Sequence, residues 1–262
     1  MWQQRNTEIV KHEEIMENHF LLTLIAPEII EEVKPGQFIN VRATKQLDPL
    51  LRRPISIFGA DSSKGELSIV YRVVGRGTEM LSKKKAGELL DIIGPLGNGF
   101  LLPPNDPNHV LVIGGGIGLA PLQFLVRTLI NDGHKVTLIA GLRNKEQLPL
   151  LELFPKTGVE LIITTDDGSF GKQGIVTEVS ADLLKESNIS MLYSCGPEAM
   201  LAAVAKQAHG LNIPCQVSVE RTMACGVGAC LGCVCELKKD NELKYAHVCQ
   251  DGPVFWGNEV IF

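Results

Sequence analysis

The segment HVLVIGGGIGLAPLQFL, residues 109–125, divides the chain into two parts of different character. A strand-like run leads into four glycines and then into an apolar segment with helical spacing, which predicts a strand, a tight turn and a helix. The glycines let the turn approach a ligand closely and present amide groups at the start of the helix. Because glycine and proline interrupt the apolar residues, the segment is not predicted to span a membrane.

Behind this turn, strand-like and helix-like segments alternate. We expect strands at 135–142, 159–165, 190–195 and 215–219, and helices at about 148–154, 176–187 and 198–210. Such alternation is typical of a parallel sheet with helices on its faces. The sequence therefore predicts a parallel α/β nucleotide-binding domain over residues 108–219.

Two strand ends of this sheet are candidates for binding a nucleotide. The first turn departs from the dinucleotide-binding pattern G-x-G-x-x-G, and no acidic residue closes the second strand. On its own, this glycine-rich turn is therefore explained equally well by nucleotide binding and by tight packing of the backbone. The segment YSCGPEAM, residues 193–200, places a second turn at the carboxyl edge of the sheet, where open α/β sheets bind their ligands. The candidate residues are Gly114, Gly115, Gly116, Gly118, Cys195, Gly196 and Pro197.

The part of the chain before the α/β domain has a β pattern. Short β-prone runs such as QFINVRA (37–43) and ELSIVYRVV (66–74) are separated by turn signals, with little helical periodicity. This pattern predicts an antiparallel β-barrel or sandwich over residues 1–102. The segment LPPNDPN at 102–108 contains three prolines and marks the domain boundary.

An anion site is predicted within this first domain. Arg53 opens the run RPIS, and the segment GRGTEML (75–81) predicts a helix with Thr78 at its N-cap. The guanidinium and the helix start are together suited to a pyrophosphate, although an exposed arginine on a strand is the alternative. Tyr71 is suited either to present an aromatic face or to pack in the core.

The cysteines near the end of the chain have a characteristic spacing. Cys225, Cys230 and Cys233 follow C-x4-C-x2-C, and Cys249 comes after fifteen further residues, which is the order of plant-type [2Fe–2S] ligands. Glycines between them allow the backbone to fold tightly and to donate amide hydrogen bonds to sulfur. A structural zinc site, the competing interpretation, usually pairs two short C-x2-C hairpins, and only one such pair is present. Cys235 is expected to pack in a strand rather than to bind metal.

Composition limits the classes of function. The 262 residues carry a formal net charge of −5, and basic and acidic residues are mixed along the chain, which argues against nucleic-acid and membrane-surface partners. The first twenty residues show no signal-peptide pattern, so a cytoplasmic location is expected. Seven cysteines in a reducing compartment indicate metal or redox chemistry rather than disulfides.

The motifs taken together resemble a known superfamily. RPIS, VYR, GT, GGGIGLAP and CGP resemble the ferredoxin–NADP reductase superfamily, in which a flavin barrel precedes a nicotinamide-binding domain. ERTMACGVGACLGC and CQDGPVF (249–255) resemble the electron-transfer subunits of NAD-dependent (class 1B) dihydroorotate dehydrogenases, and this similarity covers essentially the whole chain. It implies a multidomain fold that ends in a small [2Fe–2S] domain at residues 220–262.

The resemblance also implies the cofactor sites. [2Fe–2S] would be held by Cys225, Cys230, Cys233 and Cys249, and the glycine turn and Cys195-Gly196-Pro197 would bind NAD+. Ser56 and Cys195 would lie near the flavin and the nicotinamide, and the chain would supply no catalytic residue for dihydroorotate oxidation. The residues implied to bind FAD are Arg53, Pro54, Ile55, Ser56, Val70, Tyr71, Arg72, Gly77 and Thr78.

The implied activity is electron transfer in pyrimidine biosynthesis. By the resemblance, electrons pass from an FMN-containing catalytic subunit through [2Fe–2S] and FAD to NAD+, in a heterotetramer with two copies of each subunit. Bifurcating ferredoxin–NADP reductases are similar, but typically have Asp where Cys225 stands. The motifs are also compatible with a sulfide dehydrogenase or hydrogenase subunit, a self-sufficient reductase or a zinc-binding interaction module. Arg143 is either a contact for an adenosine 2′-phosphate or solvated.

Overall fold

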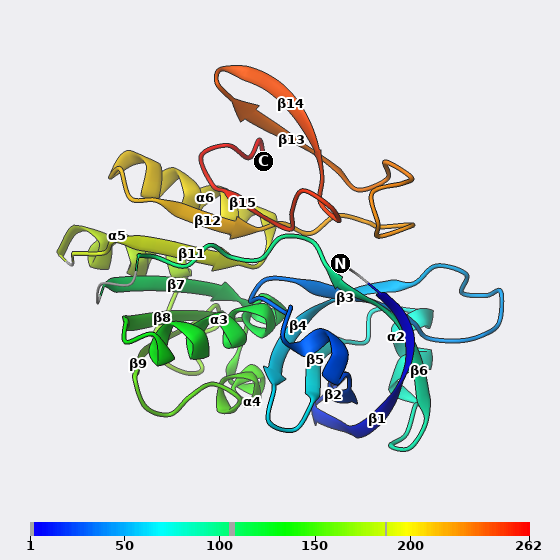
Figure 1. Cartoon of the computed structure of the whole chain (residues 1–262). Helices are drawn as coiled ribbons and strands as arrows, with labels where there is room; N and C mark the ends of the chain where they lie inside the picture. The colour runs from blue at the N-terminus through cyan, green and yellow to red at the C-terminus, as the bar shows by residue number, and fades with distance from the viewer. Residues whose placement is uncertain (1–2, 105–107, 187) are drawn as a thin grey trace.

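The computed structural model describes residues 3–104, 108–186 and 188–262, so part of the predicted boundary at 102–108 lies outside the described residues. Within the described residues the first domain is a closed antiparallel barrel with strand order β1-β2-β5-β4-β3-β6 (Figure 1). Its strands are β1 (Gln3–Met16), β2 (His19–Ile25), β3 (Phe38–Arg42), β4 (Arg53–Asp61), β5 (Glu66–Arg72) and β6 (Leu89–Leu96), with short helices α1 (Pro27–Ile30) and α2 (Arg76–Ser82).

The barrel closes because alternate residues of its strands are apolar and point inward. In β3, Ile39 and Val41 are completely buried in the barrel core, whereas Asn40 between them lies on the opposite face of the strand. In β4, Ile55 and Ile57 likewise face the core. The prediction of an antiparallel β domain is confirmed, as a barrel rather than a sandwich.

The second domain is a parallel sheet flanked by helices. Among the described residues the sheet order is β10-β9-β8-β7-β11-β12-β15. Its strands are β7 (His109–Gly115), β8 (Lys135–Leu142), β9 (Val159–Thr165), β10 (Lys172–Gln173), β11 (Met191–Cys195), β12 (Cys215–Ser218) and β15 (Val254–Trp256). The helical elements are η1 (Gly116–Gly118), α3 (Leu119–Asn131), η2 (Lys145–Gln147), α4 (Pro149–Glu152), α5 (Val176–Glu186) and α6 (Glu198–Gly210). The helix expected at about 148–154 is a single α turn preceded by a 3-10 turn.

The C-terminal segment is not an independent appendage. A loop containing three of the predicted ligand cysteines leads into the hairpin of β13 (Val234–Lys239) and β14 (Glu242–His247). The chain then returns as β15, which pairs antiparallel with β12, with Val217 opposite Phe255. The last strand therefore extends the sheet of the second domain, a pairing that the sequence pattern did not predict.

Two apolar contacts hold the three parts together. The start of α3 and the α4 turn pack on the outer face of the barrel through a cluster of Leu21, Phe58, Val70, Ala120 and Leu150. On another side of the barrel, Phe38 and Leu96 share a core with Cys233, Cys249 and Phe255 of the C-terminal segment. In Figure 1 this segment, coloured orange to red, lies across both the barrel and the sheet.

None of the described helices is long and apolar enough to cross a bilayer.

Candidate functional site

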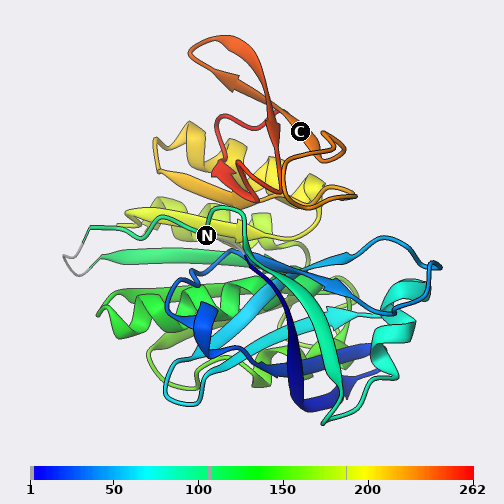
Figure 2. The same cartoon turned by 45° about the vertical axis from the view of Figure 1, so that its right-hand side comes forward.

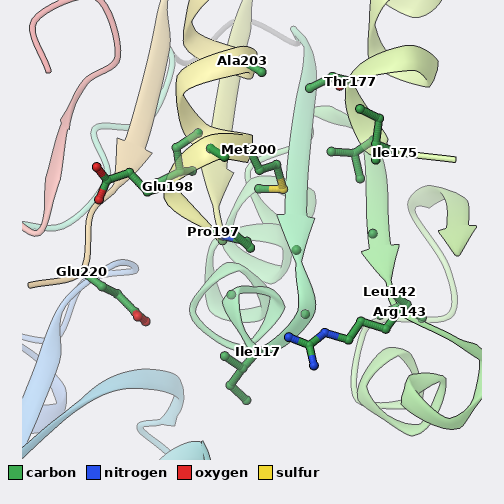
Figure 3. Close-up of a pocket in the computed structure, with 18 of the residues that line it drawn as sticks. Ile117, Leu142, Arg143, Ile175, Thr177, Pro197, Glu198, Met200, Ala203 and Glu220 are labelled. Carbon is green, nitrogen blue, oxygen red and sulfur yellow. The ribbon is translucent and has the colours of Figure 1, made fainter. Parts of the chain in front are cut away.

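A cavity of about 650 Å³ lies at the carboxyl edge of the parallel sheet (Figure 3). This volume is within the range of roughly 300–1,000 Å³ that ligand sites occupy. The cavity is lined by both predicted turns, and it reaches Arg72 at the end of barrel strand β5. A ligand bound here would therefore extend from the sheet toward the barrel.

The two turns are packed against each other backbone to backbone. A Cβ on Gly118 would lie 2.6 Å from the carbonyl oxygen of Cys195 and 2.7 Å from the Cα of Gly196. A Cβ on Gly115 would lie 2.9 Å from Pro197. Glycine is required at these two positions so that the turns can pack closely. Tight packing was one of the two roles that the sequence left open for this turn.

Gly116 differs from the other glycines of this turn. It has φ +53°, which favours glycine, and a Cβ there would meet nothing within 4 Å. Because it faces open space in the lining of the cavity, Gly116 is the position where the backbone is free to approach a ligand. The turn thus combines packing glycines with one glycine that is exposed to the site.

Cys195 ends β11 with its side chain in the protein interior. The residue is 3% exposed, and burial raises the pKa of its thiol to about 12. Burial therefore disfavours the thiolate, which is the nucleophilic form of cysteine. Cys195 lies in the second turn, as predicted, but its side chain packs in the hydrophobic core beneath the cavity.

Arg143 projects into the cavity from the end of β8, with its guanidinium directed toward Ile117 in the glycine turn (Figure 3). Its backbone N–H donates to Oε1 of Gln147 at 2.7 Å. Within the described part of the chain no ion pair is formed by Arg143, whereas Arg221 across the cavity pairs with Glu198 at 2.7 Å. Arg143 is thus a cation available to an anionic ligand.

The structure brings together the barrel residues that were predicted to form an anion site. Arg53 in β4 lies over Gly77 in α2, so a Cβ on Gly77 would lie 2.2 Å from the Arg53 Nε. The prediction that Thr78 is the N-cap is wrong, because the helix begins at Arg76 with Gly75 as its N-cap. The Thr78 hydroxyl instead accepts from the backbone N–H of Val74 at 3.0 Å and fastens the turn before the helix.

The remaining barrel residues divide between core and surface. Tyr71 is buried, stacks on Phe20 at 5.7 Å and bonds through its hydroxyl to Nε2 of His12 at 2.9 Å, which agrees with a core role. Desolvation raises the pKa of this phenol. Ile55 is a barrel core residue and Val70 belongs to the cluster that contacts α3, whereas Pro54 and Ser56 are half-buried and alternate with inward-facing residues on β4.

In the C-terminal segment, backbone amides converge on cysteine sulfurs. The N–H of Cys230 lies 3.4 Å from Sγ of Cys225, and the N–H of Cys225 lies 3.5 Å from Sγ of Cys230. The N–H of Cys249 lies 3.4 Å from Sγ of Cys233, and Gly228 donates to Sγ of Cys249 at 3.1 Å. Amide donors of this kind favour thiolate over thiol, as a cluster requires.

These amide–sulfur contacts link the cysteines in two pairs, Cys225 with Cys230 and Cys233 with Cys249. A [2Fe–2S] cluster needs two thiolates on each of two irons, whereas zinc needs all four around one ion. The paired arrangement fits a two-iron cluster.

Exposure of the four cysteines changes across the site. Cys233 and Cys249 are buried, Cys225 is half-buried and Cys230 is exposed. Leu231, next to Cys230, is 61% exposed. One edge of the site is thus covered by the protein interior and the opposite edge is open.

Three protein families match successive parts of the chain. Residues 6–100 match the oxidoreductase FAD-binding domain, residues 112–206 match the oxidoreductase NAD-binding domain, and residues 220–261 match the iron-sulfur cluster binding domain of dihydroorotate dehydrogenase B. The fold and the three domains define an oxidoreductase that combines FAD-, NAD- and iron–sulfur-binding domains, which confirms the predicted fold class and cofactors.

Full-length relatives specify the family. The chain is 40% identical over 263 residues, covering both chains completely, to the dihydroorotate dehydrogenase B (NAD(+)) electron transfer subunit of Geobacillus sp. (strain WCH70). It is 42% identical to that of Geobacillus kaustophilus (strain HTA426), over 94% of each chain. The chain belongs to the family of dihydroorotate dehydrogenase B electron transfer subunits.

Solved structures support the architecture. A structure of an NADH-dependent reduced ferredoxin–NADP oxidoreductase superposes with a TM-score of 0.86 and 32% identity, over 98% of this chain and 90% of that one. The ferredoxin reductase of carbazole 1,9a-dioxygenase shares the fold with a TM-score of 0.70 at 23% identity, over 81% of this chain and 67% of that one.

Two contacts at the site were missed by sequence reasoning. The side-chain amide of Asn40 in β3 donates to the carbonyl of Cys225 at 3.3 Å. Asn98, in the segment GPLGNGF (94–100), donates to the carbonyls of Gln250 at 3.2 Å and Asp251 at 3.0 Å. The sequence signal was weak in both cases, because a polar residue on the outer face of a strand or in a turn is usually solvated.

Proposed function

We propose that this chain is the electron-transfer subunit of a cytoplasmic, NAD-dependent dihydroorotate dehydrogenase of pyrimidine biosynthesis. In this proposal it takes electrons from the flavin of an FMN-containing catalytic subunit, through a [2Fe–2S] cluster and FAD, to NAD+. The assembly would be a heterotetramer with two copies of each subunit. The single observation that carries the proposal is the paired cysteine site, which lies against the flavin-type barrel within one core.

The chain's own residues support three adjoining sites. Arg53 and the backbone at Gly77 are suited to hold the FAD pyrophosphate, since a guanidinium binds phosphate through a planar fork of donors. The cavity at the sheet edge is suited to the nicotinamide dinucleotide, with Gly116 and Arg143 at the turn. A flavin bound between these sites would accept electrons singly and release them to NAD+ as a hydride.

The nucleotide cavity and the cysteine site each have one end toward the barrel and one end away from it. The cavity extends from Arg143 to Arg72, so a dinucleotide with its phosphates near Arg143 would direct its other end toward the barrel. The open edge at Cys230 and Leu231 offers an apolar, accessible surface for a partner that delivers electrons. The cysteines on the buried edge share a core with barrel residues Phe38 and Leu96.

Copurification with absorption spectroscopy tests the proposal. Purified gently from its source, the chain should carry flavin and iron–sulfur absorption bands, and a dihydroorotate-oxidising subunit should elute with it. Dihydroorotate should then reduce NAD+ only when both chains are present. Oxidation of dihydroorotate by the isolated chain, or a colourless zinc-containing protein, would contradict the proposal.

The second candidate function is a subunit of a related ferredoxin–NADP reductase. The observation that favours it is the structural similarity at TM-score 0.86. It predicts that ferredoxin, rather than a dihydroorotate-oxidising subunit, exchanges electrons with the purified protein. Cys225 favours the dihydroorotate assignment, because a full set of four cysteine ligands is present.

Gly77→Ala should weaken FAD binding without unfolding the barrel. The new methyl group would occupy the space of the Arg53 guanidinium, which is the flexible end of a side chain and can move away. Loss of charge-assisted hydrogen bonds to the pyrophosphate should raise the FAD dissociation constant on the order of 10- to 100-fold. Flavin fluorescence during dialysis measures this constant.

Gly75→Ala is the matched control for this experiment. Its Cβ would meet nothing within 4 Å, and its φ of 171° is extended backbone that any residue adopts. Normal FAD affinity in Gly77→Ala, or an equal loss in both variants, would show that Arg53 does not hold the pyrophosphate.

Arg143→Ala should raise the Michaelis constant for NADH about tenfold, which corresponds to roughly 1.4 kcal/mol of lost binding. The guanidinium is directed toward the glycine turn, where the dinucleotide phosphates are expected. NADH oxidation with an artificial acceptor measures the constant, and Arg127→Ala, an exposed position on α3, is the control. A selective loss of NADPH activity would place Arg143 at the 2′-phosphate instead.

A further inference from the structure

Asn40 lies on the outer face of barrel strand β3, opposite Pro54 of the proposed FAD-binding run in the strand pairing. It is 1% exposed, and its side-chain nitrogen donates to the carbonyl of Cys225 at 3.3 Å. Asn40 is therefore a direct link between the barrel and the first cysteine of the cluster site.

The cluster loop is shaped around this amide. Gly226 has φ +72°, and a Cβ built on it would lie 2.3 Å from the Asn40 nitrogen. The asparagine amide thus occupies the space that a side chain at residue 226 would need. In two views the loop between β12 and β13 extends over the barrel, as this contact requires (Figure 1, Figure 2).

The side-chain oxygen of Asn40 indicates that packing alone does not account for an asparagine at this position. The Asn40 side-chain oxygen is buried and has no hydrogen-bond partner among the described residues. An unpaired buried polar atom costs stability, whereas a leucine of similar volume would carry no such penalty. What asparagine adds at this position is its N–H donor toward Cys225.

A second link reaches the opposite end of the cysteine set. Asn98 donates to the carbonyls of Gln250 and Asp251, directly after Cys249, and its backbone N–H donates to the carbonyl of Gly252 at 2.6 Å. The barrel is therefore bonded to the backbone beside the first ligand and beside the last.

We propose that Asn40 is a positioning residue for the [2Fe–2S] site, which holds the Cys225 backbone to the flavin barrel, with Asn98 as the second attachment. The inference rests on the cluster ligation proposed above. It means that the geometry of the cluster depends on a residue of the barrel, and not only on the cysteine loop.

The test compares Asn40→Leu with wild type and with Thr23→Val. Thr23 is a buried barrel residue whose hydroxyl bonds to that of Ser68 at 3.0 Å, so its substitution removes a comparable bond within the barrel sheet, between β2 and β5. The measurements are FAD content, the rate of iron release to a chelator, and the electron paramagnetic resonance spectrum of the reduced cluster. Asn40→Ala repeats the comparison if the leucine variant does not fold.

We expect Asn40→Leu to keep its FAD, to release iron about fivefold faster and to show shifted g values, while Thr23→Val behaves as wild type. Fivefold corresponds to the roughly 1 kcal/mol of a net hydrogen bond. Iron release and a spectrum equal to wild type, or equal acceleration in both variants, would overturn the inference. A wild-type chain without a cluster would overturn the ligation as well, so the two failures are distinguishable.

Discussion

Cys249→Ala should abolish the iron–sulfur cluster and leave FAD bound. Cys249 is 2% exposed and its backbone N–H donates to the Cys233 sulfur, so under the proposed ligation its loss would leave one iron with a single thiolate in a buried site. We expect iron content to fall from about two atoms per chain to nearly none. Electron transfer from the catalytic partner should fall by more than roughly 10–100-fold, which is the usual cost of losing a residue that only hydrogen-bonds to a metal ligand.

Cys235→Ala is the matched control for the ligand variant. Cys235 is also a buried cysteine of the C-terminal segment, at 3% exposure, but it lies in β13 and burial raises the pKa of its thiol. Iron analysis and the visible spectrum of both variants decide the ligand set. A cluster that survives in Cys249→Ala, or that is lost in Cys235→Ala, would mean that the four ligands are assigned wrongly.

Gly118→Ala should disable the nucleotide cavity while the barrel and the cluster site remain intact. Its methyl group would lie 2.6 Å from the Cys195 carbonyl and 2.7 Å from the Gly196 Cα, and backbone atoms at such distances cannot move aside cheaply. The two turns that line the cavity must therefore separate. We expect the Michaelis constant for NADH to rise at least about tenfold, since a displacement of about 1 Å is enough to disrupt a binding site.

Gly210→Ala provides the comparison within the same domain. A Cβ at Gly210, the last residue of α6, would meet nothing within 4 Å, so the variant should keep wild-type kinetics and stability or gain slightly. NADH oxidation with an artificial acceptor and FAD content should be measured for both. Unchanged kinetics in Gly118→Ala would show that the contact between the two turns is not needed for the nucleotide.

Much of the architecture was predictable because its signals are local. The alternation of strands and helices after residue 109 predicts a parallel sheet, and the β runs before residue 102 predict an antiparallel domain. Cysteine spacing indicates a [2Fe–2S] site for the same reason, since three of the predicted ligands lie within nine residues. Helix boundaries were less certain, and Thr78 proved to lie inside the helix rather than at its N-cap.

The sequence by itself determined the types of domain through periodicity and the kind of metal site through cysteine spacing, because both reflect interactions between residues close together in the chain, whereas FAD and NAD followed from the resemblance of its motifs to a known superfamily. Only the tertiary structure decided that β15 joins the sheet of the nucleotide-binding domain, that Gly118 packs on Cys195, and that Asn40 holds Cys225. These contacts join residues far apart in the chain, 185 positions in the case of Asn40 and Cys225. Which residues meet therefore depends on how the strands and helices pack once they have formed. No local pattern in the sequence indicates these contacts.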